Sequence, residues 1–127
     1  MSMQKQSKKM LAAVEDLFFI VKITAAARKA GMQVEFVKAE KDLFDKAVEK
    51  PALIVMDLNF SAFQPLKVIS RLKSSPDLRQ ISVIGFLSHV QGELKQKAHE
   101  TGCDMVLAKS AFSQHLPQIL KRHASAA

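Results

Sequence analysis

Cysteine is almost absent from this sequence, since Cys103 is the single one among 127 residues. A single thiol excludes a disulfide within the chain and a metal site built on paired thiolates. Any metal ion bound by this protein must therefore use oxygen ligands or histidine. Cys103 itself is expected to be a small buried hydrophobic residue.

Long apolar runs are also missing. No stretch approaches the roughly 20 apolar residues that cross a bilayer. The first nine residues, MSMQKQSKK, are polar and lack the apolar region of a secretory signal. No internal repeat or low-complexity segment is visible. We therefore expect a cytoplasmic protein that makes no contact with membranes.

Aromatic side chains do not accompany the basic ones. The net charge of +7 suggests nucleic acid or an acidic protein as a partner. The basic residues are spread along the chain, and their only adjacent pairs are Lys8 with Lys9, Arg28 with Lys29, and Lys121 with Arg122. No aromatic residue is interleaved with these pairs as a stacking platform for bases requires. The pattern favours a solvated basic surface over a dedicated nucleic-acid face.

What the chain does have is a hydrophobic content of 48%, arranged in short apolar runs that alternate with segments of helical period. Its length fits one globular domain. We expect a flexible N-terminal segment over residues 1–8, one domain over 9–123, and a C-terminal tail over 124–127. The eight phenylalanines are expected in the core or half-buried.

The runs predict five strands and five helices in alternation. The expected strands are 10–14, 33–37, 53–56, 81–87 and 105–108. The expected helices are 17–30, 42–49, 64–73, 92–101, and a last one capped by Ser113 that carries Leu116, Ile119 and Leu120. Pro117 is expected in the first turn of that helix, where proline is tolerated. Such alternation predicts an α/β fold with a parallel sheet covered on both faces.

Polar residues follow the strands at the edge where an open α/β sheet binds its ligands, outside the carboxyl ends of the strands. Glu15 and Asp16 follow the first strand, Asp57 the third, Ser88 the fourth and Lys109 the fifth. Two carboxylates about 5 Å apart repel by roughly 3 kcal/mol at an effective dielectric near 20. This cluster therefore needs compensation, which Lys109 and a hard divalent cation such as Mg²⁺ can supply.

Such an edge suits phosphoryl transfer. Asp57 can act as a nucleophile that becomes an aspartyl phosphate. Mg²⁺ and the Lys109 ammonium would neutralise charge on the transferring group, and the Ser88 hydroxyl would donate a hydrogen bond to it. A phosphatase that uses Asp57 is disfavoured, because the position two residues on, where such hydrolases carry a second aspartate, holds Asn59.

Over roughly residues 9–123 the sequence resembles the receiver domain of bacterial response regulators, the CheY-like family. The resemblance is carried by AVED after the first strand, LIVMDLN for the third, VIGFLS for the fourth and GCDMVLAKS for the fifth. Spacings of 31 residues from Asp57 to Ser88 and 52 from Asp57 to Lys109 are similar to those of the family. The resemblance implies a (βα)5 flavodoxin-like three-layer sandwich, with a five-stranded parallel sheet in the order 2-1-3-4-5.

The resemblance also implies a role for each residue at this edge. Asp57 would be the phosphoacceptor and, with Asp16, a direct ligand of Mg²⁺. Asn59 would give its backbone carbonyl to the metal, and Glu15 would act through water or toward Lys109. Asp16 can in addition cap the first helix.

In this family Ser88 and Lys109 would bind the phosphoryl oxygens. The phosphoryl group comes from a histidine kinase or a phosphotransfer protein, and the domain catalyses only its own phosphorylation and hydrolysis. A downstream protein would read the result on the face formed by the fourth helix, fifth strand and fifth helix. The resemblance implies a stand-alone signalling domain, monomeric or weakly dimeric.

Several positions depart from the family pattern. The loop NFSAFQP after Asp57 lacks the usual Met-Pro and the later glycine. His89 replaces a small residue, Val106 replaces the switch aromatic, and Ser110 replaces the proline that normally carries a cis bond. The second interpretation is therefore a pseudo-receiver that binds a partner without phosphorylation.

Overall fold

The structure is a computed structural model that describes residues 8–60, 62–88 and 92–125. Most of the expected N-terminal segment and the last two residues of the tail lie outside this part. The strands are β1 (Lys8–Ala13), β2 (Met32–Phe36), β3 (Leu53–Asp57), β4 (Ser82–Leu87) and β5 (Met105–Ala108). The helices are α1 (Leu17–Ala30), α2 (Glu40–Ala47), α3 (Pro65–Ser74), α4 (Gly92–Thr101) and α5 (Lys109–Ser125).

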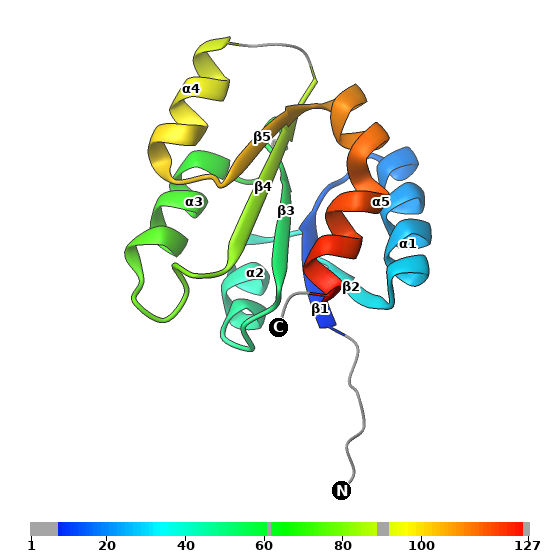
Figure 1. The fold of residues 1–127 in the computed structure, drawn as a ribbon. Coiled ribbons are helices and arrows are strands. Elements are labelled where there is room, and N and C mark those ends of the chain that lie inside the picture. The colour runs from blue at the N-terminus through cyan, green and yellow to red at the C-terminus, as the bar shows by residue number, and fades with distance from the viewer. Residues whose placement is uncertain (1–7, 61, 89–91, 126–127) are drawn as a thin grey trace, which may run out of the picture.

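The five strands form one parallel sheet in the order β2-β1-β3-β4-β5. Helices α1 and α5 lie side by side on one face, and α2, α3 and α4 cover the other (Figure 1). The predicted α/β sandwich and its strand order are confirmed. Among the described residues, no helix is both long and apolar enough to cross a membrane.

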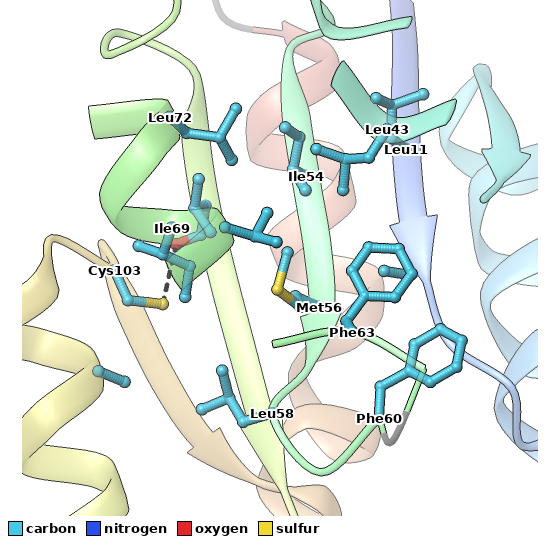
Figure 2. Close-up of a cluster of buried hydrophobic side chains, with 14 of the residues drawn as sticks. Leu11, Leu43, Ile54, Met56, Leu58, Phe60, Phe63, Ile69, Leu72 and Cys103 are labelled. Atoms are coloured by element: carbon cyan, nitrogen blue, oxygen red, sulfur yellow. Dashed lines mark hydrogen bonds between the residues drawn. The ribbon is translucent and has the colours of Figure 1, made fainter. Parts of the chain in front are cut away.

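Strand β3 is the middle strand of the sheet, and it pairs with β1 on one side and β4 on the other. All five of its residues are buried. Its side chains alternate between two apolar cores, one under each helical layer. Figure 2 shows Ile54 and Met56 in the core beneath α2, α3 and α4, while Leu53 and Val55 belong to the core beneath α1 and α5. A near-continuous apolar run is what a strand buried on both faces requires.

Helix α5 differs from its predicted course. It begins at Lys109, immediately after β5, so Ser113 lies inside the helix and is not its cap. The prediction that Pro117 lies in the first turn is therefore wrong, since it is the ninth residue of the helix. Proline has no N–H to donate to the Ser113 carbonyl four residues earlier. Pro117 is exposed, so water can reach the helix surface around it.

One phenylalanine is also misplaced by the prediction. Phe18 is 64% exposed, whereas the other seven phenylalanines are buried or half-buried. Its neighbours Leu17 and Val21 are similarly exposed, at 75% and 67%. These three residues form an apolar patch at the start of α1, next to the carboxyl edge of the sheet.

Candidate functional site

Asp57 ends β3 and is the one buried charged residue among those described, with 6% of its surface exposed. Its Oδ1 accepts a hydrogen bond from the backbone N–H of Asn59 at 2.9 Å. Burial raises the pKa of Asp57; the Asn59 N–H and the positive charge of Lys109 oppose the rise, and Glu15 and Asp16 add to it. The carboxylate is thus held in place at an electrostatic cost that a cation at this edge would reduce.

Asp16 serves two purposes at the same edge. Its Oδ1 accepts a hydrogen bond from the Phe18 N–H at 2.8 Å and caps α1, as the sequence allowed. Its Oδ2 lies 3.5 Å from the Lys109 ammonium. Glu15 is exposed beside it, on the loop between β1 and α1. The acidic pair therefore lies at the edge with Asp57, and Asp16 is already engaged with α1 and α5.

Lys109 reaches this edge from the first residue of α5. Its side chain is 28% exposed, and its ammonium lies 5.3 Å from the centroid of the Phe19 ring. That ring stacks on Phe86 at 5.1 Å, and Phe86 in turn stacks on Phe112 at 4.7 Å. Phe86 is the residue of β4 in register with Asp57.

The Lys109 ammonium thus lies between the Asp16 carboxylate and the Phe19 ring. Sequence reasoning missed this contact of Lys109. The signal was the position of Phe19, three residues after the cap Asp16, on the turn of α1 that faces the core.

The loop after β3 links two strand ends. The Asn59 side-chain Oδ1 accepts a hydrogen bond from the backbone N–H of Ser88 at 3.0 Å, which ties the end of β4 to the loop that follows Asp57. Ser88 is exposed at that edge. Beyond Asn59, the rings of Phe60 and Phe63 stack at 4.8 Å and are both buried against the core (Figure 2). In this chain two aromatic anchors hold the loop that lacks the usual Met-Pro.

The structure describes two of the three positions that depart from the family pattern, Val106 and Ser110. Val106 is buried in β5 and packs in the core that contains Leu87 and Ala98. Ser110 is the exposed second residue of α5. The described peptide bonds include no cis bond, so the one between Lys109 and Ser110 is trans. His89 lies outside the described residues.

Metal ligands at this edge are few. The described residues contain no group of three or more His, Cys, Asp or Glu side chains that could hold a metal ion by themselves. Mg²⁺ needs less than this, because it usually binds one or two carboxylates and keeps several waters. Asp16 and Asp57, with a backbone carbonyl from the adjoining loop, are of the types that Mg²⁺ accepts.

Cys103 takes no part in this chemistry. It is buried just before β5, with its sulfur 3.2 Å from the Met105 carbonyl and 3.5 Å from that of Val83. Figure 2 draws the contact with Val83 as a dashed line. Burial raises the pKa of its thiol to about 11, so the thiol stays neutral near pH 7.

Neither family models nor curated proteins match this chain, whereas solved structures do. The chain is similar to the signal receiver domain of a signal transduction histidine kinase from Syntrophus aciditrophicus, with a TM-score of 0.79, 22% identity, and coverage of 94% of this chain and 91% of that one. It is also similar to the receiver domain of a sensor histidine kinase from Pseudomonas aeruginosa, which has magnesium coordinated in its active-site cleft, with a TM-score of 0.77, 19% identity, and coverage of 94% and 99%.

A chemotaxis response regulator of Vibrio cholerae is similar at a TM-score of 0.77 and 18% identity, with 92% of this chain and 98% of that one covered. All three similarities extend over nearly the whole of both chains, and the strand order of this sheet agrees with the order that the resemblance implied. This chain therefore has the fold of the CheY-like receiver domains of response regulators.

Proposed function

We propose that this protein is a phosphorelay receiver of the cytoplasm, which accepts a phosphoryl group on Asp57 in the presence of Mg²⁺ and signals by binding a partner. The observation that carries the proposal is the burial of Asp57 at the carboxyl edge of the sheet, where the paired Asp16 and Lys109 also lie. A carboxylate that is buried at an electrostatic cost is typical of a functional site.

The chemistry follows from the geometry of Asp57. Its Oδ1 accepts a hydrogen bond from the Asn59 N–H, and Oδ2 would be the nucleophile. Oδ2 attacks the phosphorus of a phosphohistidine, the P–N bond breaks, and the leaving imidazole keeps the electron pair and takes up a proton. The reaction modifies the chain itself, so the protein is a signalling domain and not an enzyme with a separate substrate.

Residues at the ends of four strands, β1, β3, β4 and β5, would balance the charge at the transferring group. Lys109, now between Asp16 and the Phe19 ring, would bind one phosphoryl oxygen, and the Ser88 hydroxyl would donate a hydrogen bond to another. When bound, Mg²⁺ neutralises negative charge on the phosphoryl group. Asp16, Asp57 and the Asn59 carbonyl would hold the metal directly, and Glu15 would hold it through water.

The phosphoryl donor we propose is a protein, either a histidine kinase or a phosphotransfer protein. Leu17, Phe18 and Val21 are exposed next to Asp16. An apolar patch beside a reactive group suits a protein surface better than a small phosphodonor. We assign the output to the face formed by α4, β5 and α5.

A specific observation favours a second candidate function. Both oxygens of Asp16 are engaged, one as the cap of α1 and the other with Lys109, so a metal ion would have to compete for this residue. Val106 also occupies the place of the switch aromatic and is fully packed. In the second candidate the chain is a pseudo-receiver, which binds its partner without phosphorylation.

Incubation with acetyl phosphate and Mg²⁺, followed by intact-mass measurement, tests the first candidate. We expect the wild-type protein to gain one phosphoryl group. The gain should be absent in Asp57→Asn and present in Asp77→Asn, which alters an exposed carboxylate elsewhere in the chain. Absence of the adduct in the wild-type protein, together with unchanged thermal stability on addition of Mg²⁺, would contradict the receiver and favour the pseudo-receiver. Partner binding that disappears in Asp57→Asn would contradict the pseudo-receiver.

A further inference from the structure

Helices α1 and α5 lie side by side on one face of the sheet (Figure 1). Residues from both helices line a groove between them. It has a volume of about 700 Å³. Small and apolar side chains from both helices contribute most of its lining and are called its floor below, namely Ala25, Ala26, Ala30, Leu116, Pro117 and Ala124. Its described lining includes none of the polar residues at the carboxyl edge of the sheet, namely Glu15, Asp16, Asp57, Ser88 and Lys109. A ligand could therefore bind in the groove whether or not Asp57 is phosphorylated.

The rim of the groove is basic. Lys22 and Lys29 from α1 and Lys121 from α5 line it. Lys22 and Lys29 are seven residues apart, so they lie on the same side of α1, about 10.5 Å apart along its axis. Neither forms an ion pair with a carboxylate in the described part of the chain.

Most of the net positive charge of the chain lies on α1 and α5. Helices α1 and α5 carry six Lys and Arg residues and no Asp or Glu, which accounts for six of the seven net positive charges of the chain and leaves the rest at +1. The two helices that cover this face of the sheet therefore carry most of the net positive charge of the chain, although Lys109 among them is paired with Asp16. A positive potential concentrated on one face attracts acidic partners.

The form of the groove decides among acidic partners. A second copy of this chain would bring another basic face against this one and be repelled. Within the described residues, the lining contains no aromatic side chain on which nucleic-acid bases could stack, and a concave floor does not insert into a membrane as a convex apolar helix face does. An apolar channel between two helices fits a third helix that lays its apolar side into it.

We propose that the groove between α1 and α5 binds an acidic amphipathic helix of another protein. About two turns of that helix would place small or branched apolar side chains on the alanine floor. Asp or Glu residues on one flank would face Lys22 and Lys29, and those on the other flank would face Lys121. The binding should weaken as salt rises, since exposed charge pairs are screened.

Three synthetic helical peptides of equal length test the proposal. The first carries a Leu and Ala stripe at helical spacing with Glu on both flanks, the second has the same stripe with Lys in place of Glu, and the third has the Glu composition with the stripe scrambled. We expect only the first to bind, with amide chemical-shift changes confined to α1 and α5. Equal binding of the scrambled peptide would overturn the proposal, because it would show attraction to charge alone.

Variants of the protein separate rim from floor. Lys22→Glu with Lys29→Glu should weaken binding of the first peptide about tenfold or more, and Ala25→Phe should weaken it by filling the channel from an exposed position. The matched control, Lys67→Glu with Lys95→Glu on α3 and α4, changes the net charge equally and should leave binding unchanged. Equal losses in both double variants, or tighter binding of a single-stranded oligonucleotide or of anionic vesicles than of the peptide, would overturn the proposal. Thermal melts show whether each variant is folded.

Discussion

At the scale of single residues, the decisive feature is a carboxylate that the fold itself penalises. Burial raises the pKa of Asp57, so the folded protein favours the protonated form more than the unfolded chain does. The charged form therefore costs stability at any pH above the folded-state pKa. This cost disappears once the pH falls below the unfolded value near 3.8, where both states are protonated.

Asp57→Asn should accordingly raise the melting temperature of the metal-free protein near pH 7, because the amide removes the buried charge and keeps the shape. The gain should shrink as the pH is lowered toward 4. Melting curves of both proteins, recorded in a chelator across this range, check the trend. Asp77→Asn is the control and should show no such pH-dependent difference. A lower melting temperature for Asp57→Asn at neutral pH would show that the carboxylate contributes favourable contacts that outweigh its burial.

At the scale of elements, the limits of α1 follow from its two ends. Asp16 caps the first turn, and Gly31 ends the helix in the left-handed conformation at φ 75°. The Gly31 N–H donates to the carbonyls of Ala27 and Arg28. Both ends were readable in the sequence, because a capping carboxylate and a terminal glycine act on their nearest neighbours.

Gly31→Ala should lower the free energy of unfolding by about 1 kcal/mol, since an L side chain is strained at positive φ. A β-carbon at this position meets nothing within 4 Å, so the loss would come from the backbone alone. Urea denaturation measures it as a lower midpoint with an unchanged slope. Gly92→Ala at the start of α4 is the matched control, because its surroundings are equally open and its φ is not positive. A loss of the same size in Gly92→Ala would remove the conformational explanation.

At the scale of the whole molecule, site and stability are linked through binding. If Mg²⁺ binds the folded protein at Asp16 and Asp57, it stabilises the fold by about 2.7 kcal/mol at a concentration one hundred times its Kd. We therefore expect the melting temperature of the wild-type protein to rise with Mg²⁺ at constant ionic strength and to return when a chelator is added. Asp57→Asn should respond less, and NaCl at equal ionic strength should have no such effect. An equal response of both proteins would place the metal elsewhere.

The sequence alone determined the features that depend on local pattern. Apolar runs alternating with segments of helical period predicted the α/β sandwich, and the polar residues that end the strands predicted which of them lie at one edge. Asp16 as a cap and Cys103 as a buried residue were also predicted correctly. The cap and the extent of each apolar or helical segment depend on residues a few positions apart, where spacing is a reliable guide.

Only the tertiary structure decided what depends on neighbours distant in the chain. Ser113 looks like a cap, yet α5 begins at Lys109 because β5 runs directly into it. The contact of Lys109 with Phe19 and the groove lined by lysines from both helices depend on α1 and α5 sharing a side of the sheet. Strand order and helix placement bring these residues together, and no local period encodes that arrangement.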